Sequence, residues 1–591
     1  MAESPRWCGS IPSAAGATPS ATLPGPSPPA STTTLPRGHP LRRPPPATTS
    51  FLRGHPCDHP APGPAVRSRP PPLSSAAGHQ LCCLCCHAWR RLGEVISRET
   101  GAGEELISLC NRGRENKNGR PRLKATRNEA AASNANEDRL SKLPNDLLLN
   151  ILERLDTLDA IRTCILSRQM LKLPTMLSRL YLTFSLKGVL RTNHAVAYVT
   201  DNILSTRSPE VTISELKIRF LLLPNDSLII GRSVARAMAT QKVAAAEFEI
   251  VTKKRYSLCS SADLVQFGKQ FNDLFGACPH AFAGLTSLWL QNMRFGELDI
   301  PNILSTCKLL EYLRLSHCDS GVHAVLQVEH DQLVELKVDQ GKFERVELIC
   351  LPKLQRMTYD NWFSSQGPLY FGFVPQLSKL SLIKTRIRSD KTLELSQLLA
   401  NVPSIDYLRL DFRSEKIWIL PECPKLLKPV LNKLQHVNLD HLPEGCDLAW
   451  TMFILEAAPS LKELCITVWD HWCIMITNKE LRKKYCFCEK ADVKWKPYAP
   501  DFNHKNLAKL TIYGFQPDDN FMRYIRCVAE HAVNITEISL YDRKVCGRCG
   551  DLDPEIKDSV CPSRYPPTAE ERKQITEELG LSSVDVVHFR S

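Results

Sequence analysis

Apolar residues recur along this chain with two different spacings, and the two spacings predict different elements. Between Leu147 and Leu155 they fall three and four residues apart, which places them along one side of a helix. Pro144 stands where the first turn of that helix would begin, a position in which proline gives up only a dispensable N–H. A second short helix is predicted from about Asp159. The apolar positions of the two helices are Leu147, Leu148, Ile151, Leu152, Leu155, Ile161, Cys164, Ile165 and Leu166.

These helices carry more apolar surface than so short a segment can bury against itself. Two or three helices in about thirty residues leave part of the Leu and Ile side chains without a covering layer. The pattern therefore predicts a helical module whose free apolar face binds a partner. The alternative is an ordinary helical hairpin that is buried against the rest of the chain.

A second pattern, L-x-x-L-x-L, follows this segment. Ten copies recur at intervals of 21 to 29 residues, with one interval of 46, and three weaker copies precede them. The ten copies are Leu285/Leu288/Leu290, Leu310/Leu313/Leu315, Leu333/Leu336/Val338, Leu354/Met357/Tyr359, Leu377/Leu380/Leu382, Ile405/Leu408/Leu410, Leu434/Val437/Leu439, Leu461/Leu464/Ile466, Leu507/Leu510/Ile512 and Ile535/Ile538/Leu540; the weaker three are Leu177/Leu180/Leu182, Ile213/Leu216/Ile218 and Ala245/Phe248/Ile250.

A single triplet carries little weight, because 43% of the residues are hydrophobic. Four copies, however, are preceded by similar residues. In each, the end of a predicted helix is followed by Cys, Pro or Val and then by the triplet: ILSTCKLL, LLANVPSI, ILEAAPSL and VAEHAVNI. Most intervals fit the period of leucine-rich repeats, in which a helix packs onto a short parallel strand and each unit stacks on the next. The sequence thus predicts a solenoid. Its long interval, from Val468 to His504, is either a degenerate repeat or an insertion.

Residues between the apolar positions of such strands point away from the core, and stacking turns them into columns on the concave face. One column runs Tyr312, Glu335, Arg356, Lys379, Tyr407, His436, Glu463; a second runs Trp289, Arg314, Lys337, Thr358, Ser381, Arg409, Asn438; a third contains Asp339, Asp360, Asp411, Asp440. Mixed aromatic and charged side chains suit a protein ligand. We predict a target-binding set of Trp289, Tyr312, Arg314, Arg356, Tyr407, Arg409 and His436. The alternative is a merely solvated strand face.

The segment from Asp138 to Arg168, DRLSKLPNDLLLNILERLDTLDAIRTCILSR, resembles an F-box of the plant type. The opening D-R-L-S-x-L-P-x-D-L-L, the following I-L-E-R-L and the closing I-R-T-C-I-L-S-R carry the resemblance. One departure concerns the aromatic-rich W-R-x-L-W with which the family usually continues, because Gln169 to Pro174 read QMLKLP instead. Loss of the tryptophans removes a large contact area at the far end of the module. We therefore expect weaker binding of the adaptor protein that an F-box binds.

The resemblance implies the substrate-recognition subunit of an SCF-type, cullin–RING E3 ubiquitin ligase, in which the F-box binds a Skp-type adaptor and the repeats bind a target protein. The adaptor-binding positions that it implies are Leu143, Pro144, Leu147, Leu148, Ile151, Leu152, Ile161, Cys164 and Leu166. No nucleophile elbow and no phosphate-cradling glycine pattern occurs, so we expect a non-catalytic chain without a cofactor. The alternative is a leucine-rich-repeat interaction scaffold with a degenerate F-box and no ligase role.

The first hundred residues have a different composition. Nineteen of the 42 prolines lie between Pro5 and Pro72, among Ser, Thr, Ala and Gly, which predicts disorder. Residues 1–93 hold nine Arg, no Lys and two acids, or +7 of the formal net charge of +12. The rest is only mildly basic, so no nucleic-acid partner is expected. F-box partners imply a location in the nucleus, the cytoplasm or both; an organelle transit peptide is the alternative that the N-terminal composition leaves open.

Most of the 23 cysteines stand singly inside apolar patterns, as expected for reduced, buried thiols. Cys546 and Cys549 form a C-x-x-C with Cys561 further on, but no second C-x-x-C lies at a usable spacing for zinc. Metal binding there stays open, and a zinc-dependent nucleic-acid binder is a third interpretation. No apolar run is long enough to span a bilayer, so no membrane partner is expected.

The residues after Leu540 resemble the C-terminal FBD region of plant F-box/leucine-rich-repeat proteins. A helix is predicted around Thr568 to Leu579, because Thr and acidic residues open it. The fold class that follows is α/β, with a small helical F-box and a leucine-rich-repeat horseshoe after a disordered N-terminus. The predicted boundaries are 1–136 for the N-terminal region and basic linker, 137–175 for the F-box, 176–540 for the solenoid and 541–591 for the C-terminal cap.

Overall fold

The structure, a computed structural model, describes residues 143–155, 157–165, 170–184, 189–321, 323–362, 367–384, 392–468, 493, 495–498, 502–543, 564–581 and 586–590. All of them belong to one compact unit, Ser74–Ser591. The N-terminal region predicted to be disordered lies outside the described residues, as do Leu166 and the cysteines at 546, 549 and 561.

A small helical module opens the described chain. It consists of α3 (Asn145–Leu152), α4 (Thr157–Ile165) and the 3-10 helix η2 (Met170–Met176). Pro144 is the N-cap of α3, one residue before the first turn in which the sequence predicted it. Both α3 and α4 pack on η2, and α4 also packs on the first strand of the sheet. The module is therefore joined to the rest of the chain by packing as well as by the backbone.

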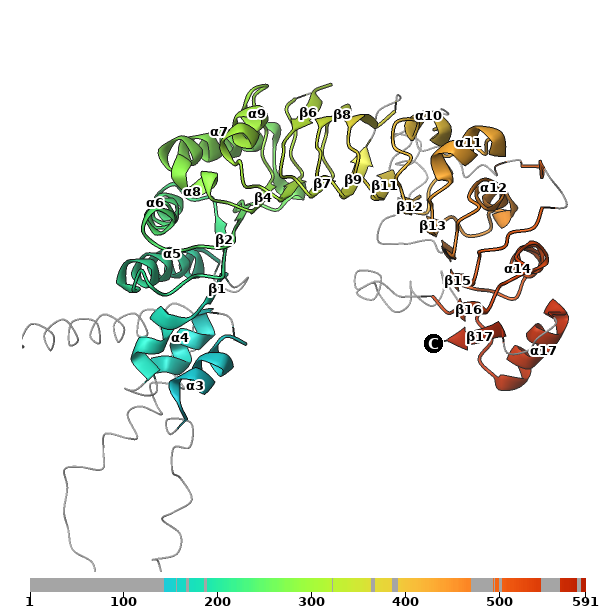
Figure 1. Cartoon of the computed structure of the whole chain (residues 1–591), viewed down its shortest axis with the longest axis horizontal. Helices are drawn as coiled ribbons and strands as arrows, with labels where there is room; N and C mark the ends of the chain where they lie inside the picture. Colours follow the sequence, from blue (N-terminus) through green and yellow to red (C-terminus); the bar gives the residue numbers. More distant parts are fainter. Residues whose placement is uncertain are drawn as a thin grey trace, which may run out of the picture. The chain divides into compact units, whose positions relative to one another are not determined.

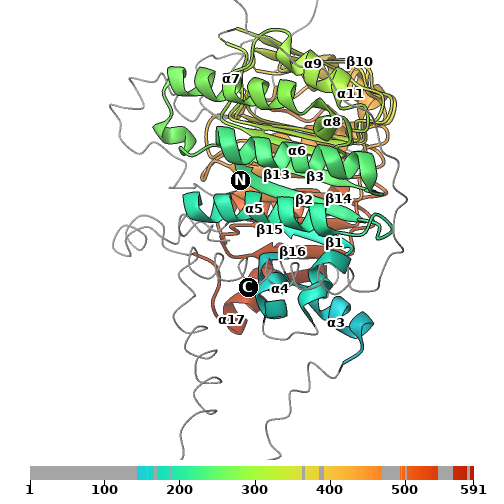
Figure 2. The same ribbon diagram turned by 90° about the vertical axis from the view of Figure 1, so that its left-hand side faces the viewer.

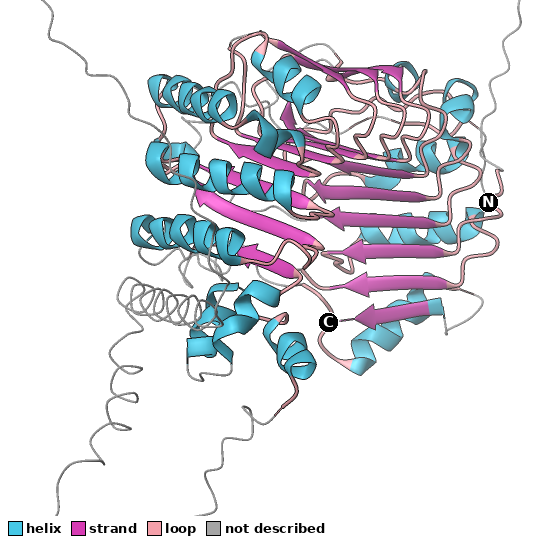
Figure 3. Cartoon of the chain, turned by 60° about the vertical axis from the view of Figure 1, so that its left-hand side comes forward, coloured by secondary structure: helices cyan, strands magenta, loops and turns pink. Residues whose placement is uncertain are grey.

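The main element is one parallel sheet of 14 strands, shown from the side in Figure 3. Its strands follow one another in chain order, each paired in parallel with the next member of the series. They are β1 (Arg179–Leu182), β2 (Glu215–Leu221), β3 (Ala246–Val251), β4 (Ser287–Gln291), β5 (Tyr312–Ser316), β7 (Glu335–Asp339), β9 (Arg356–Trp362), β11 (Lys379–Lys384), β12 (Tyr407–Asp411), β13 (His436–Leu442), β14 (Glu463–Val468), β15 (Lys509–Tyr513), β16 (Glu537–Tyr541) and β17 (Val587–Arg590).

The strand register confirms the predicted repeat. The second and third apolar residues of each triplet pair with those of the next, as Leu288 and Leu290 do with Leu313 and Leu315, and all are buried. Strand β14 pairs directly with β15, so no strand of the sheet lies between them. The long interval is therefore an insertion between two neighbouring repeats and not a degenerate repeat.

Helices cover the convex side of the curved sheet, while the strands line its concave side (Figure 1). Figure 2 shows the first of these helices stacked in chain order. None of the described helices combines the length and apolarity that crossing a membrane requires. The elements are α5 (Val189–Thr206), α6 (Pro224–Thr240), η3 (Tyr256–Leu258), α7 (Ser261–Ala277), α8 (Pro279–Ala283), α9 (Asp299–Thr306), α10 (Leu395–Leu398), α11 (Pro424–Leu431), η4 (Leu448–Thr451), α12 (Met452–Ala457) and α14 (Asp519–His531).

The middle repeats depart from the predicted helix-on-strand unit. Here three short strands, β6 (Val325–Glu329), β8 (Arg345–Cys350) and β10 (Leu369–Phe373), form a second parallel sheet on the convex side. The triplets of these repeats are only 21 to 23 residues apart. So short a unit leaves too little chain for a helical return, and alternating sequences such as VLQVE bury every second residue as a strand does.

The predicted C-terminal helix is present as α17 (Ala569–Leu579). Thr568 caps it and forms a reciprocal capping box with Glu571, as the sequence indicated. The following strand β17 was not predicted. It pairs with β16, and the hydroxyl of Tyr565 donates to backbone carbonyls of both strands, at Leu540 and Arg590. The end of the solenoid is thus covered by a strand and a helix together.

A cluster of aromatic rings holds the early repeats to their helices. Phe248 on β3 meets Phe220 on β2 and Phe282 on α8 edge to face, with ring centroids 5.4 and 5.6 Å apart. We predict that Phe248→Ala lowers the free energy of unfolding by about 3 to 5 kcal/mol, because it removes a fully buried ring and leaves a cavity. Val265→Ala, at a half-exposed position of α7, is the control and should change it by less than about 0.5 kcal/mol. Urea denaturation followed by circular dichroism measures both; equal midpoints would contradict the prediction.

Candidate interaction surfaces

Helix α3 and the residues that flank it carry a set of exposed apolar side chains. Leu147, Ile151 and Leu155 follow one another at i, i+4 and i+8, and are 54, 42 and 39% exposed. Pro144, one turn earlier, is exposed as well. Leu147 and Ile151 lie four residues apart on one face of α3, while Pro144 precedes the helix and Leu155 lies in the turn after it. These four exposed residues are called the ridge. Single exposed leucines are common on proteins, but a contiguous apolar row marks a contact surface.

The opposite side of α3 faces inward and corrects part of the predicted partner-binding set. Leu148 and Leu152 on α3 are buried, and so are Ile161 and Cys164 on α4. These four side chains form the core of the module, where the chain's own residues cover them, so they are not available to a partner. Leu143 is half-buried, and Leu166 lies outside the described residues. Among the described members of the predicted set, Pro144, Leu147 and Ile151 are the exposed ones.

The apolar residues of η2 that stand where the family has tryptophans are also buried. Met170, Leu171, Leu173 and Pro174 of η2 are buried, and η2 packs on α3, α4 and α5. Hydrogen bonds join the module to the first strand: Glu153 Oε1 accepts from the backbone N–H and the hydroxyl of Ser178, at 2.9 and 2.6 Å, and Thr157 Oγ1 accepts from the N–H of Tyr181 at 2.7 Å. Burial lowers the pKa of the neighbouring Arg207 to about 10, although the negative charge of Glu153 acts to raise it. The module and the first repeat are therefore one packed body.

The strand register aligns the predicted columns on the concave face. Tyr312 pairs with Glu335, which pairs with Arg356, and the series continues in order to Glu463. The second column is aligned in the same way from Trp289 to Asn438. Of the predicted target-binding residues Tyr312 is exposed; the others, Trp289, Arg314, Arg356, Tyr407, Arg409 and His436, are partly exposed.

Three of these residues meet in a hollow of about 650 Å³ over strands β2 to β7. The guanidinium of Arg314 lies 3.9 Å above the ring of Trp289 and pairs with Asp339 at 2.5 Å. The indole N–H of Trp289 donates to Ser316 Oγ at 2.9 Å. Tyr312 completes the aromatic part of the wall. These contacts hold the Trp289 ring in place while part of it stays open to a ligand.

Charged pairs surround the hollow. Lys217 pairs with Glu247 at 2.8 Å and Arg219 with Glu249 at 3.0 Å, both between β2 and β3. Burial raises the pKa of Glu249, although the positive charges of Arg219 and Lys217 act to lower it. Next to Tyr312, Arg356 pairs with Glu335 at 2.6 Å. Each pair joins neighbouring strands, so much of the charge of the wall is balanced within the protein.

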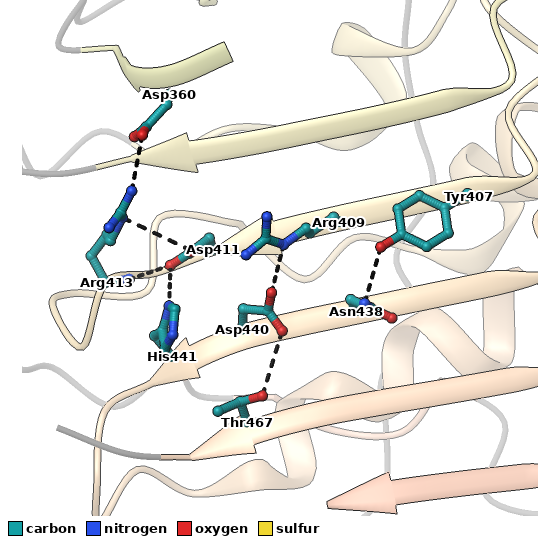
Figure 4. A network of polar contacts seen from close by, with 9 residues as sticks. All are labelled: Asp360, Tyr407, Arg409, Asp411, Arg413, Asn438, Asp440, His441 and Thr467. Atoms are coloured by element: carbon teal, nitrogen blue, oxygen red, sulfur yellow. Dashed lines mark hydrogen bonds and ion pairs between the residues drawn. The ribbon is translucent and has the colours of Figure 1, made fainter. Parts of the chain in front are cut away.

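A second polar network lies on the later strands and contains Tyr407 and Arg409 (Figure 4). Arg409 pairs with Asp440 at 2.6 Å, and Asn438 Nδ2 donates to the hydroxyl of Tyr407 at 3.0 Å. Beyond the strand ends, Arg413 joins two aspartates: a terminal guanidinium nitrogen contacts Asp360 at 2.9 Å, and its backbone N–H donates to Asp411 at 2.9 Å. His441 Nδ1 contacts the same Asp411 oxygen at 2.8 Å.

The pKa values of the two aspartates around Arg413 shift in opposite directions. Burial raises the pKa of Asp360, because the single side-chain contact of Arg413 only partly offsets it. Burial acts on Asp411 in the same direction, but the hydrogen bond and charge of His441, with Arg413, outweigh it and lower the pKa of Asp411. Ionised Asp411 is therefore favoured by the folded chain, and ionised Asp360 is disfavoured.

Comparison with known proteins shows where both parts of the chain recur. The F-box domain family matches residues 140–180, and the leucine-rich-repeat domain family described as At1g61320/AtMIF1 matches residues 277–566. Three proteins of Arabidopsis thaliana are similar: F-box/FBD/LRR-repeat protein At5g56420, 24% identical over 284 residues, F-box/LRR-repeat protein At1g55660, 27% over 269, and putative F-box/FBD/LRR-repeat protein At4g00315, 26% over 188. The chain therefore combines an F-box domain with a leucine-rich-repeat domain, as plant F-box/leucine-rich-repeat proteins do.

The similar segments cover 46, 43 and 30% of this F-box/leucine-rich-repeat protein and 65, 66 and 42% of the relatives, less than two thirds of each relative. F-box domains generally bind Skp-type adaptors, and leucine-rich repeats bind protein targets. The module of α3, α4 and η2 falls within the matched F-box, so the exposed ridge belongs to the F-box. The hollow lies on β2 to β7, partly within the matched repeats.

Sequence reasoning missed Arg413 and His441, which connect the aspartates of the third column. Both lie at the ends of strands, with φ of 52 and 53°, where the alternation of the strand no longer applies. The motif Asp411-Phe-Arg413 carried no recognisable signal. Among the described residues no group of three His, Cys, Asp or Glu side chains could hold a metal. The cysteine motif proposed for zinc lies outside the described part of the F-box/leucine-rich-repeat protein.

The opposite pKa shifts predict opposite pH dependences. A lowered pKa means that ionised Asp411 stabilises the fold above its unfolded pKa, near 3.8, and that this stabilisation is lost as the pH falls through the folded pKa. Asp411→Asn should therefore cost about 2 to 3 kcal/mol at pH 7 and progressively less below about pH 4. A raised pKa means that ionised Asp360 opposes folding above its folded pKa. Asp360→Asn should therefore cost less at pH 7.

Urea unfolding of both variants and the wild type between pH 3 and pH 7 measures these differences. Each variant is the control for the other, because both replace a buried aspartate beside the same Arg413. Parallel pH curves for the two variants would show that the two carboxylates have the same ionisation behaviour and would contradict the prediction.

Proposed function

We propose that this chain is the substrate-recognition subunit of an SCF-type E3 ubiquitin ligase, in which the F-box binds a Skp-type adaptor and the repeats bind a target protein. The observation that carries the proposal is the exposed ridge of Pro144, Leu147, Ile151 and Leu155 on the F-box. An apolar row in water is unfavourable by about 25 cal/mol per Å² of apolar surface, and a partner that covers it recovers that free energy. The F-box match supports the adaptor as this partner.

The junction between the F-box and the repeats supports the second half of the proposal. Glu153 and Thr157 bind backbone N–H groups at Ser178 and in the first strand, and η2 packs on α3, α4 and α5. A target held by the repeats would then keep a defined position relative to the adaptor. Ubiquitin transfer from a bound enzyme to a lysine depends on such proximity, so the chain contributes positioning and no bond-making of its own. Its place of action is then the nucleus, the cytoplasm or both, where adaptors of this class act.

The target is expected to meet the hollow at Trp289. Tryptophan, tyrosine and arginine dominate the binding energy of protein interfaces, and the hollow presents Trp289, Tyr312 and Arg314 side by side. The neighbouring cations are paired with carboxylates of adjacent strands. A target therefore gains most by covering the aromatic rings, while the paired charges set its orientation.

A second candidate function is a repeat scaffold that binds a partner without any ligase role. The observation that favours it is η2, whose apolar residues are buried within the chain in place of an exposed aromatic end. The two functions share the hollow but differ at the ridge of α3. Binding of a purified adaptor separates them.

We predict that Leu147→Asp combined with Ile151→Asp weakens adaptor binding more than tenfold, because two charges would be buried against an apolar partner. Both side chains are exposed, so the F-box itself should remain folded. Isothermal titration of the full chain with a Skp-type adaptor measures the affinity. Leu190→Asp, at an exposed leucine of α5, is the matched control and should bind as the wild type does.

If the double variant binds the adaptor with unchanged affinity, the result contradicts the ligase proposal and favours the scaffold. Leu148 is unsuitable for this test, because it is fully buried and a charge there would unfold the module. Circular dichroism of each variant distinguishes lost contact from lost fold.

At the hollow, we predict that Trp289→Ala reduces target capture by about 30-fold or more, equivalent to about 2 kcal/mol for an aromatic anchor. Tyr370→Ala is the control, because Tyr370 is an exposed aromatic residue on the convex sheet. Quantitative mass spectrometry of proteins that co-purify with each variant, with adaptor recovery as the internal standard, gives the comparison. A partner lost from Tyr370→Ala but retained by Trp289→Ala would place the target on the other face.

A further inference from the structure

The loop between β3 and α7 combines three cations with an exposed serine. Lys253, Lys254 and Arg255 precede Tyr256, Ser257 and Leu258, which form the single turn η3. We propose that Ser257 is a phosphorylation site for a protein kinase that selects basic residues before the target serine and an apolar residue after it. The proposal concerns a modification of this loop and does not depend on adaptor binding.

The serine is accessible, and its loop can be opened at small cost. Ser257 is exposed and Leu258 is 71% exposed. The turn is held by two backbone hydrogen bonds of its own, from Leu258 to Arg255 and from Cys259 to Tyr256, both at 2.9 Å. Kinases bind their substrates in extended form, so this turn and the stacking of Tyr256 on His317 have to open.

The flanks of the loop are anchored, which limits the opening to the residues that a kinase needs. On one side Asn292 Nδ2 donates to the carbonyl of Lys254 at 3.0 Å. On the other side Ser260 and Asp263 form the capping box of α7. The sheet and the helix can thus stay folded while the serine is presented.

The positions of the charges match a base-directed kinase. Lys254 and Arg255 stand three and two residues before Ser257, where acidic subsites of such kinases attract cations, and Leu258 follows it, where an apolar pocket fits. Lys254 already pairs with Asp263 at 2.7 Å, so the exposed Arg255 is expected to contribute most.

Basic residues before a hydroxyl side chain do not by themselves make a phosphorylation site, because the hydroxyl must also be accessible. Thr576 also follows two basic residues, Arg572 four positions before it and Lys573 three positions before it. Its hydroxyl, however, donates to the carbonyl of Arg572 at 2.8 Å inside helix α17. A kinase would have to unwind that helix first. We therefore expect Ser257 and not Thr576 to be modified.

The reaction consumes ATP. The Ser257 hydroxyl oxygen attacks the γ-phosphorus, the bond from that phosphorus to the oxygen bridging the β- and γ-phosphates breaks, and ADP leaves. The hydroxyl proton passes to the carboxylate base of the kinase. The product carries about −1.5 to −2 charges at a place where the chain now presents cations.

The new charge would lie near the end of strand β5. Tyr256 stacks on His317 with ring centroids 4.0 Å apart, and the ammonium of Lys342 lies 5.6 Å from the Tyr256 ring centroid. His317 directly follows Ser316, the residue that accepts the indole hydrogen bond of Trp289. A phosphate on Ser257 would therefore attract Arg255 and Lys342 and alter the charge beside Trp289 without a change in the core.

The test incubates the full chain with ATP and the catalytic subunit of cAMP-dependent protein kinase, used as a base-directed probe, and follows each phosphopeptide by mass spectrometry. We expect phosphate on Ser257, none at this position in Ser257→Ala, and a rate at least tenfold lower in Arg255→Glu. Lys308→Glu, an exposed lysine outside the motif, is the matched control and should react at the wild-type rate.

Absence of phosphate at Ser257, while a short basic reference peptide in the same tube is fully converted, would overturn the proposal. An unchanged rate in Arg255→Glu would also overturn it, because recognition would not use the basic residues. All substitutions are at exposed positions, and circular dichroism checks that the fold is retained. Adaptor affinity measured on the same samples should not change, which keeps this test separate from that of the ligase proposal.

Discussion

The structure depends on the parallel pairing of successive strands. A single repeat cannot bury its own apolar triplet, because a short strand and a short return segment enclose too little volume. Stacking places Leu288 against Leu313 and Leu313 against Leu336, and the buried row continues through the sheet. This constraint explains why the triplets keep their register even where the return segment changes from a helix to a strand. It also explains why both ends of the described sheet carry additional elements, the helical F-box at β1 and α17 with β17 after β16.

The same pairing determines the character of the binding face. Cations of the second column lie beside carboxylates on the next strand, as Arg314 does beside Asp339 and Arg409 beside Asp440. The charges are therefore largely balanced before any ligand arrives, and the half-exposed rings of Trp289 and Tyr312 offer the surface that a partner can cover with most gain. The residues just after strands β4 and β5 are left-handed, with φ of 58° at Asn292 and 52° at His317, and both contact the loop of Ser257.

Much of this architecture could be predicted from the sequence, because the relevant signals are local. The spacing of Leu285, Leu288 and Leu290 shows which residues face inward, and the register then follows from stacking. The orientation of the first helix could not be read in the same way. Leu147 and Leu148 are adjacent apolar residues on one stripe, and only the position of α4 and η2 decides that the first is exposed and the second is buried. Contacts such as Arg413 with Asp360 join residues 53 positions apart at strand ends, where no periodicity applies.

The hydrogen bonds between the F-box and the first repeat have a consequence for how the domains can be separated. Glu153 and Thr157 satisfy backbone N–H groups of Ser178 and Tyr181 at the outer edge of β1. An uncovered strand edge readily pairs with another chain and promotes aggregation. Deletion of the F-box would therefore expose the unpaired edge of β1 together with an apolar patch. An insoluble repeat fragment would then reflect lost edge protection, and not a failure of the repeats to fold.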